Sequence, residues 1–473
     1  MTGNQAPALE SLRRVAGSAG QEHLFRYWDR LSNASRQQLL QQVAMIDFKL
    51  VAHLHQHLVL AEPSTHEIAL EPPEMISLRE QQEQPRQCRE MITRGEELLR
   101  GGKVAALLVA GGQGSRLGFD GPKGVYAIGP LSKKSLFQLH AEKLLAMSQK
   151  YRAVIPWYIM TSVANDADTR GFFEKHRYFG LNPRNVFFFI QGMIPAIDVQ
   201  GKIIMDAADH IFMNPDGHGG VLTALGKSGA LADMRKRGIA EIFYFQVDNV
   251  LVNMCDPLFI GFHVAAGADM SAKVCGKRDP FEKVGVIGKK NGKLAVIEYS
   301  DMSDQDKEAR NPDGSLQYNA GNVALHMFRT GFIEHELEAG AKLPWHLAHK
   351  QIPCLNDHGE LVQPNEPNGY KFETFVFDAL GDAKACVLLE VERFKEFSPI
   401  KNYSGLDSPL TARRDMSHFY ADWLEKAGVS VARDDSGWPI AKIEISPLFA
   451  MTAEELAHKL PPHLKLGREL YLA

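Results

Sequence analysis

A glycine-rich loop followed by two cations is the stretch of this sequence best suited to chemistry. The apolar run 104–110 ends at the residues GGQG (111–114), and a loop without side chains can bring its backbone N–H groups directly against a ligand. Arg116 and Lys123 add fixed positive charge to the same loop. Because bare amides and cations together suit a polyphosphate, the loop predicts a cradle for a triphosphate.

Two widespread phosphate-binding loops do not fit this stretch. A Walker-type loop needs G-x-x-x-x-G-K-[ST], and no glycine–lysine pair here has that spacing. The dinucleotide fingerprint G-x-G-x-x-G fails because Leu117 stands where its third glycine belongs. A plain glycine-rich turn is the alternative on the loop alone. The ordered string G-G-x-G-[ST]-R-L-G-x-x-x-P-K-G favours a ligand site, because it is long and specific.

Alternating strands and helices must position this loop. Apolar strands are expected at 103–110, 153–160, 185–190 and 241–247, with amphipathic helices near 135–149, 166–179 and 221–237. This alternation is typical of an α/β fold with a largely parallel sheet. Ligands collect at the carboxyl ends of such strands, where both the glycine loop and Asp248 lie, so both are expected in one crevice.

Three domains are expected: a helical N-terminal domain (1–100), a central domain (101–395) and a small C-terminal domain (396–473). In the first, Ser35 and Gln38 have capping-box spacing and predict the start of a helix with apolar residues at steps of three and four through Leu54. Phe25, Trp28 and Leu31 suggest an earlier amphipathic helix. The last domain should contain a helix at 417–426.

The composition narrows the class of protein. The chain has 473 residues, enough for a large core, and its apolar content of 45% and charged content of 23% are ordinary for a globular protein. A net charge of −4 argues against nucleic acid as a partner. Five scattered cysteines without a C-x-x-C pair fit a reduced compartment. Without an apolar leader or a membrane span, a cytoplasmic protein is expected.

The glycine-loop string resembles the nucleotide-binding signature of the UDP-sugar pyrophosphorylases (UDPGP type 1), most closely the UDP-N-acetylhexosamine pyrophosphorylase branch. Segments similar to that family recur in order over most of residues 90–415: QGM (191–193), PDG (215–217), VDN (247–249), VGV (284–286), EYS (298–300), NAGN (319–322), FVFD (375–378) and FSPIKN (397–402). The resemblance implies a Rossmann-like, GT-A-like nucleotidyltransferase domain with a mostly parallel mixed sheet, a helical N-terminal region and a small α+β C-terminal domain.

The implied reaction is uridylyl transfer from UTP to a sugar 1-phosphate, most closely N-acetylglucosamine 1-phosphate, with release of pyrophosphate. Arg116 and Lys123 would hold the β- and γ-phosphates, and Lys401 would meet the phosphates from the opposite side of the cleft by domain closure. Asp248 would bind Mg²⁺, with Mn²⁺ as an alternative ion. Catalysis is then mostly positioning and charge neutralisation, and no general base is required.

The same resemblance implies how the nucleotide is recognised. Gly111 and Gly112 would lie under the nucleotide, while Gln191 and Gly217 would recognise uracil. His218 stands where the family usually has asparagine, which leaves the sugar preference open. This ring could make activity sensitive to pH near neutrality, or it could supply the same N–H donor as asparagine.

For the sugar, the resemblance implies Gly285, Glu298, Asn322, Phe375 and Phe377. Glu298 would accept hydroxyl protons, and Asn322 would read the N-acetyl group or a neighbouring hydroxyl. The two phenylalanines would form an apolar wall for the acetyl methyl, although alternating phenylalanines are also typical of ordinary strand core. Two other interpretations stay open: another sugar 1-phosphate (N-acetylgalactosamine, glucose or galactose), or a nucleotide-sugar-binding protein without catalysis. A monomer is expected, because no helical stripe or repeat indicates an interface.

Overall fold

The computed structural model describes residues 5–61, 69–340, 343–461 and 464–473, which form two compact units. Unit 1 comprises the described parts of Met1–Glu67, Gln191–Gly220 and Leu343–Val376. Unit 2 comprises the described parts of Ile68–Ile190, Val221–Lys342 and Phe377–Ala473. Each unit is therefore assembled from stretches that lie far apart in the sequence. Within the described residues, no helix has the length and apolar character that a membrane span requires.

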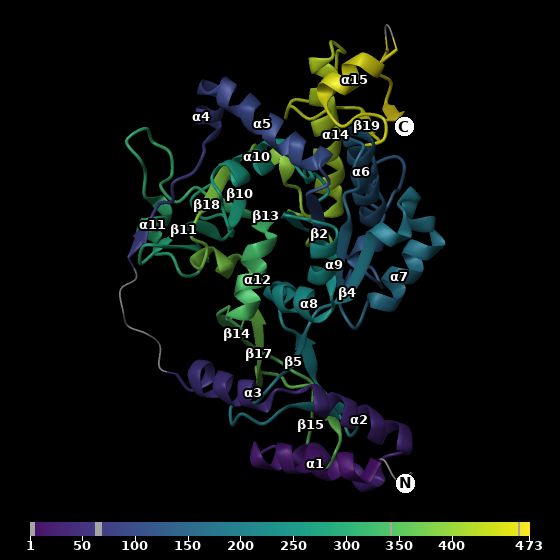
Figure 1. Ribbon diagram of the computed structural model, residues 1–473, viewed down its shortest axis with the longest axis vertical. Coiled ribbons are helices and arrows are strands. Elements are labelled where there is room, and N and C mark those ends of the chain that lie inside the picture. The colour runs from purple at the N-terminus through teal and green to yellow at the C-terminus, as the bar shows by residue number, and fades with distance from the viewer. Residues whose placement is uncertain (1–4, 62–68, 341–342, 462–463) are drawn as a thin grey trace. The chain divides into compact units, whose positions relative to one another are not determined.

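Unit 2 is built on a ten-stranded mixed sheet (Figure 1). Its strands are β1 (Leu70–Glu71), β2 (Val104–Val109), β3 (Trp157–Thr161), β4 (Val186–Ile190), β9 (Glu241–Gln246), β10 (Met270–Cys275), β11 (Val286–Lys290), β12 (Lys293–Ile297), β13 (Gly321–Arg329) and β18 (Cys386–Glu390). The strands β9, β2, β3 and β4 lie in that order and are parallel, and β13 continues the sheet antiparallel to β9. This confirms the predicted α/β class with a mixed, mostly parallel central sheet.

The parallel strands form because each is apolar on both faces. All but the last residue of β2 (VAALLV) are buried, and Leu107 pairs with Tyr158 of β3 on one side and Tyr244 of β9 on the other. A strand covered by helices on both faces has no solvent side, so it needs no alternation of polar residues. The four strands expected from the sequence are confirmed, with shifts of a few residues at their ends.

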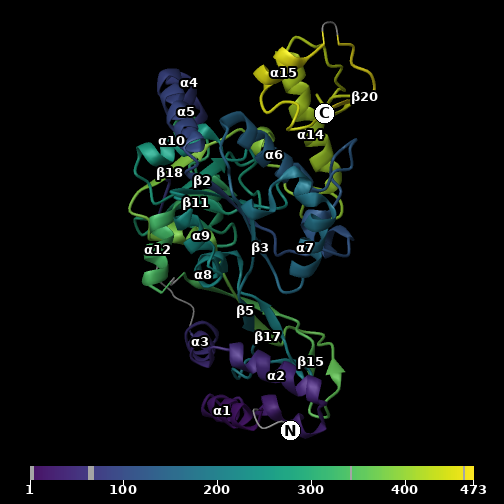
Figure 2. The ribbon, with the colours of Figure 1, turned by 45° about the vertical axis from the view of Figure 1, so that its right-hand side comes forward.

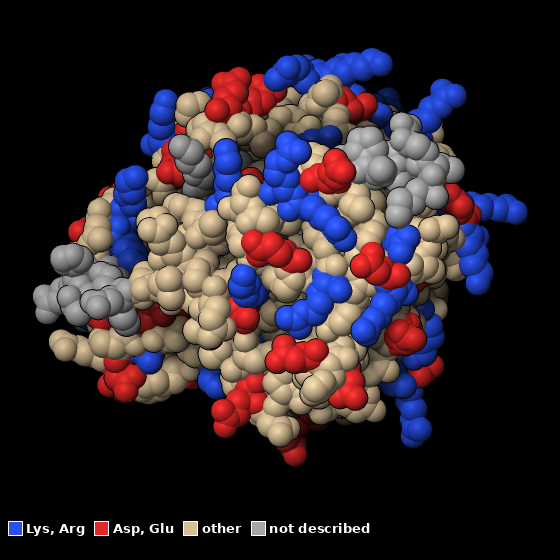
Figure 3. Space-filling model, turned by 90° about the horizontal axis from the view of Figure 1, so that it is seen from below, with Lys and Arg blue, Asp and Glu red and all other residues tan. Residues whose placement is uncertain are grey.

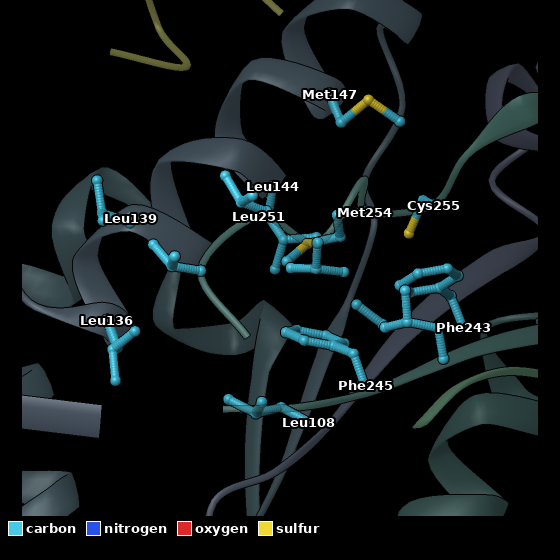
Figure 4. Packing of buried hydrophobic residues seen from close by; sticks show 14 of the residues in the cluster. Leu108, Leu136, Leu139, Leu144, Met147, Phe243, Phe245, Leu251, Met254 and Cys255 are labelled. Carbon is cyan, nitrogen blue, oxygen red and sulfur yellow. The ribbon is translucent and has the colours of Figure 1, made fainter. Parts of the chain in front are cut away.

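Helices cover this sheet. They are α4 (Leu78–Glu83), α5 (Pro85–Arg100), α6 (Leu136–Tyr151), α7 (Asp166–Lys175), α8 (Val221–Lys227), α9 (Ala230–Lys236), α10 (Pro257–Ala265), α11 (Asp304–Glu308), α12 (Thr330–Glu338) and α13 (Arg393–Glu396). Figure 4 shows the apolar face of α6 gathered with side chains of β2, β9 and the loop after β9. The single helix expected at 221–237 is wrong: Gly229, with φ of +81°, separates α8 from α9.

The C-terminal part of unit 2 is a small α+β region, yellow in Figure 2. It contains α14 (Pro409–Lys426), β19 (Lys442–Ile445), α15 (Ala453–Lys459) and β20 (Glu469–Leu472). The helix α14 begins earlier than its predicted start at residue 417, because Ser408 and Thr411 form a capping box ahead of it. The Glu444 carboxylate of β19 accepts hydrogen bonds of 2.8 Å from the backbone N–H groups of Leu131 and Ser132, and so fixes this region to the chain that follows the glycine loop.

Unit 1 packs helices on small two-stranded sheets around an apolar core. Its elements are α1 (Gln5–Ser18), α2 (Asn33–Met45), α3 (Phe48–Leu54), β5 (Met193–Pro195), β6 (Met205–Ala207), β7 (His210–Ile211), β8 (Met213–Pro215), β14 (Trp345–Lys350), β15 (Cys354–Leu355), β16 (Leu361–Val362) and β17 (Gly369–Thr374). On the face seen in Figure 3, basic and acidic side chains are interspersed, as the small net charge predicts.

Two expectations for the first hundred residues are wrong. The cap of α2 is Ser32, which accepts the Ser35 N–H, and a new helix starts after Asp47 instead of one helix running through Leu54. The expected helix with Phe25, Trp28 and Leu31 is two 3-10 helices, η1 (Glu22–Phe25) and η2 (Trp28–Arg30). The first error has a clear cause: Ser and Asp side chains compete for backbone N–H groups wherever they stand, so the spacing alone does not fix which of them acts as the cap.

Candidate active site

The glycine loop of unit 2 folds back on itself. The Gly114 N–H donates to Gly121 O (2.9 Å), and the Lys123 N–H donates to Gly112 O (3.1 Å). The second bond brings the end of the loop beside its beginning, directly after the carboxyl end of β2. Lys123, which opens the 3-10 helix η5 (Lys123–Val125), is thereby returned to the strand end, as a phosphate cradle requires.

The glycines of this loop are needed for different reasons. A Cβ at Gly114 would lie 2.6 Å from Phe119 Cδ1, and one at Gly124 would lie 2.2 Å from the Phe137 ring, so the packing of the protein itself excludes side chains there. At Gly112, a Cβ would meet only Lys123 Cε, at 4.0 Å. The packing of the described residues thus leaves room for a side chain at 112, and a ligand approaching the backbone is the remaining reason for glycine. Gly111 beside it is half-buried.

Lys123 and Asp248 form an ion pair at this strand end. Since β2 and β9 are parallel with Val109 opposite Gln246, the residues after both strands meet at one edge of the sheet. Lys123 Nζ lies 3.2 Å from Asp248 Oδ2, and their side chains are 18% and 11% exposed. A partly desolvated cation and carboxylate side by side can separate to meet a phosphate and a divalent cation. One carboxylate, supplemented by phosphate oxygens and water, is a donor set that Mg²⁺ accepts, so Asp248 fits that ion.

Lys401 reaches the same strand end from the C-terminal part of unit 2. The Ile400 N–H donates to Asp248 O (3.1 Å), which fixes the backbone of the neighbouring Lys401 beside Asp248. The Lys401 side chain is exposed, with Nζ 5.8 Å from the centre of the Phe397 ring. The structure therefore brings the backbone of Lys401 to the Lys123–Asp248 pair. Arg116 is exposed within the glycine loop, in the 3-10 helix η4 (Ser115–Leu117).

The three polar positions predicted for the sugar lie together in unit 2. The Asn322 N–H donates to Gly285 O (2.9 Å), and a Cβ at Gly285 would lie 3.3 Å from Glu298 Oε1. They meet because β11 pairs with both β12 and β13 where Val286 begins the strand. Since β13 is antiparallel to β9, its first residues lie at the sheet edge where β9 ends. The predicted sugar group and the phosphate group thus share one edge of the sheet.

The predicted uracil group lies in unit 1, where β5 pairs with β8. The pairing of Met193 with Pro215 places Gln191 near Gly217, and Gln191 is buried. Gly217 has a φ of +85°, and a Cβ there would lie 2.3 Å from Thr374 O, so only glycine fits this turn. The structure thus brings the two residues predicted to recognise uracil to one end of the antiparallel β5–β8 pair.

His218 follows this turn and stacks on Phe375, with ring centres 5.2 Å apart. The Val376 N–H donates to His218 Nδ1 (3.2 Å), so the ring proton of the neutral imidazole lies on Nε2. Burial, helped by the charge of His346, lowers the pKa of His218 to about 4. Of the two alternatives for this position, the neutral N–H donor is therefore favoured over titration near neutrality, because the desolvated imidazole stays neutral.

The two phenylalanines of the predicted acetyl wall are not strand core. β17 ends at Thr374, before both of them. Phe375 is half-buried and also stacks on His346, at 4.3 Å, whereas Phe377 belongs to unit 2 and is buried. The alternative of plain alternating strand positions is therefore excluded.

Three supporting residues were missed from the sequence. His140 and Lys143, on the buried face of α6, donate to backbone oxygens on either side of Asp248: His140 Nε2 to Val247 O (3.1 Å), and Lys143 Nζ to Val250 O (2.8 Å). Burial lowers the pKa of His140 to about 3 and that of Lys143 to about 7. Their spacing on an otherwise apolar helix face was the available signal. The third residue, Asn249, was noted only as part of a motif.

Known proteins are similar to this chain over most of its length. A sequence model of the family described as UTP–glucose-1-phosphate uridylyltransferase matches residues 50–442. The UDP-N-acetylglucosamine pyrophosphorylase of Saccharomyces cerevisiae is 37% identical, covering 93% of this chain and 94% of its own. The human UDP-N-acetylhexosamine pyrophosphorylase-like protein 1 is 38% identical, covering 94% of both chains.

A solved structure agrees as well. The UDP-N-acetylglucosamine pyrophosphorylase of Trypanosoma brucei, in complex with an inhibitor, is 29% identical over 100% of this chain and 99% of its own, with a TM-score of 0.84. The resemblance seen in the glycine-loop string and the segments after it is thereby confirmed. With the family model spanning most of its length and relatives covering it almost from end to end, this chain belongs to the UTP–glucose-1-phosphate uridylyltransferase family.

Proposed function

We propose that this chain transfers a uridylyl group from UTP to N-acetylglucosamine 1-phosphate, forming UDP-N-acetylglucosamine and pyrophosphate. The observation that carries the proposal is the Lys123–Asp248 pair, held against a glycine loop whose Gly112 the protein's own packing does not require. The relative in S. cerevisiae, similar over nearly the whole chain, is a UDP-N-acetylglucosamine pyrophosphorylase, which supports this substrate.

In the proposed reaction, a phosphate oxygen of the sugar 1-phosphate attacks the α-phosphorus of UTP, and pyrophosphate leaves with the electron pair of the broken P–O bond. Both reactants are anions, so the protein must first offset their repulsion. Lys123 and Arg116 bind the β- and γ-phosphates and stabilise the leaving group, and Lys401, whose backbone is held beside Asp248, adds a third cation at the same phosphates. Asp248 would hold Mg²⁺, which supplies a further positive charge at the phosphates when bound.

The remaining predicted residues recognise the two ends of the product. The buried Gln191 amide and the tight turn at Gly217 are suited to the imide edge of uracil. Glu298 accepts from sugar hydroxyls, and Asn322 and the Gly285 backbone line the same place. Mg²⁺ as the cofactor, a monomeric state and a cytoplasmic location belong to the proposal as well, and the first two can be tested by chelation and by sedimentation.

The test is pyrophosphate release from UTP with Mg²⁺, offered the 1-phosphates of N-acetylglucosamine, N-acetylgalactosamine, glucose and galactose in parallel. Lys123→Ala should lower kcat with the preferred sugar by about 10²–10³-fold, because it removes one preorganised charge from the leaving phosphates. Lys175→Ala, at the exposed end of α7, is the matched control and should leave kcat unchanged.

Preference for glucose or galactose 1-phosphate would keep the reaction and overturn the proposed sugar. UTP binding without pyrophosphate release from any sugar would instead favour a nucleotide-binding protein without catalysis.

A further inference from the structure

Asn249, next to Asp248, bonds to one distant segment through both polar atoms of its side-chain amide, and its Oδ1 also accepts from the Leu251 N–H of its own loop (3.3 Å). Its Nδ2 donates to Glu396 O (2.7 Å), and its Oδ1 accepts from the Ser398 N–H (3.0 Å). The residue is 2% exposed, so these bonds lie out of contact with water. A buried side-chain amide that donates one hydrogen bond and accepts another from the same segment fixes both the position and the orientation of that segment.

The segment that Asn249 holds is the one that leads to Lys401. The Asn249–Pro399 backbone bridge and the hydrogen bond from Ile400 N–H to Asp248 O (3.1 Å) continue the same pairing. Beyond it, the N–H of Lys401 donates to Asp407 O (2.7 Å), which closes a turn. The backbone on both sides of Lys401 is therefore fixed, and only its side chain is free to move toward a ligand.

A buried ionic group anchors the far end of this connection. Lys273 of β10, which is 0% exposed, donates to the Glu396 carboxylate (2.6 and 2.7 Å) and lies 2.7 Å from Asp256 Oδ2. Burial of these charges is tolerated because each is paired. Glu396 thus receives Lys273 at its side chain and Asn249 at its backbone oxygen, and it cannot shift without breaking both.

The strand end after β9 is itself held from the opposite side. Lys143 Nζ donates to Val250 O and Val252 O at 2.8 and 2.9 Å, and His140 fixes Val247 O. Figure 4 shows Leu251, from this same loop, among the apolar side chains around α6. The backbone around Asp248 is therefore fixed by α6. Asn249 hydrogen-bonds the Lys401 segment to this fixed backbone.

We propose that Asn249 is a positioning residue that sets the place of Lys401 relative to Asp248 during uridylyl transfer. The inference rests on the proposed function, since Lys401 and Asp248 matter together only if they act on the same phosphates. A misplacement of a catalytic group by about 1 Å can lower the rate by about 10²-fold. Loss of the amide that holds the loop after β9 against the Lys401 segment should therefore lower kcat measurably.

The test is a double-mutant cycle on kcat. Asn249→Ala should lower kcat by about 10–10²-fold, with the KM for UTP nearly unchanged, because Lys123 and the glycine loop remain. In a Lys401→Ala background, the same substitution should have little further effect on kcat, since the cation to be positioned is gone. In an Arg116→Ala background, by contrast, the two losses should multiply.

Two results would overturn the inference: the kcat losses of Asn249→Ala and Lys401→Ala multiply in the double variant, or Asn249→Ala leaves kcat unchanged. In either case, activity of the wild type would still support the proposed function. An inactive wild type would overturn both. If Asn249→Ala does not fold, the cycle is repeated with Asn249→Asp, which keeps the acceptor for the Ser398 N–H but replaces the donor to Glu396 O by a repelling oxygen. Asn368→Ala, which removes a similar two-way amide bridge to Ile352, is the control for stability alone and should leave kcat unchanged.

Discussion

His218 is a half-buried imidazole whose charge state decides which hydrogen bonds it can make. Desolvation keeps the ring neutral, because its pKa is lowered to about 4. Because Nδ1 accepts the Val376 N–H, the ring proton lies on Nε2. The ring also has a flat surface, which stacks on Phe375. At the scale of the single residue, His218 is therefore a neutral ring whose one N–H donor is at Nε2.

His218→Asn should leave the shape of the kcat/KM profile unchanged between pH 6 and pH 8. The reason is that a group with a pKa of about 4 has no proton to gain or lose in that interval. The measurement is pyrophosphate release at half-unit steps of pH for both chains. An inflection near pH 6.5 that is present in the wild type and lost in the variant would show that His218 does titrate there.

Single residues differ in how far the sequence reveals them. The meeting of Lys123 with Asp248 was predictable, because two parallel strands that pair must end at the same edge. The place of Lys401 was implied only by family resemblance, since no periodicity links residue 401 to a strand end so far away in the chain. His140 and Lys143 bind backbone oxygens, and such partners become visible only once the helix is packed.

At the scale of elements, the crossing of α5 and α10 shows how small residues set a helix contact (Figure 1). A Cβ at Gly261 of α10 would lie 1.9 Å from Met91 O, and a Cβ at Gly95 of α5 would lie 2.0 Å from Pro257 O. Each glycine thus lets the other helix's backbone approach directly. α10 leads into β10, which carries Lys273, so this contact supports the frame behind the site.

Gly261→Ala should lower the free energy of unfolding by about 1–3 kcal/mol, because the added methyl group has only backbone to displace. Gly171→Ala, in α7, is the matched control: it has nothing within 4 Å of its Cβ and should raise stability by about 0.4–1 kcal/mol. Urea unfolding of the three chains measures both. Equal effects of the two substitutions would show that helix propensity alone, and not the crossing, decides the outcome.

The helices and strands were predictable where the pattern of apolar residues in the sequence matches the burial of the element. The strands β2, β3, β4 and β9 are continuous apolar runs, and their residues left little choice. The division of α8 from α9 and the start of α14 were missed because they depend on one glycine and one serine cap. The caps near residues 32 and 47 were missed for the same reason: several side chains could serve, and tertiary packing selects one.

At the scale of the whole molecule, the chain returns to unit 1 twice after leaving it, at Gln191 and at Leu343. Discontinuous units of this kind cannot be expressed by boundaries along a sequence, since a boundary assumes that each domain is one stretch. The ranges 1–100, 101–395 and 396–473 therefore stay predictions of three domains. Each unit nevertheless contains a histidine whose pKa is lowered by desolvation: the half-buried His218 in unit 1 and the fully buried His140 in unit 2.

These two histidines predict that both units lose stability in acid. Their folded pKa values, about 4 and about 3, lie below the value of 6.5 expected for an unfolded chain, so the unfolded state binds more protons between these limits. The stabilisation is complete above pH 6.5 and is lost as the pH falls toward 4 for His218 and toward 3 for His140. The loss between pH 7 and pH 5 is about 2 kcal/mol for each group. Urea unfolding at pH 7 and pH 5 measures the loss. His218→Asn and His140→Gln should each reduce it, because amides do not titrate, and a loss as large in both variants as in the wild type would assign the acid sensitivity to other groups.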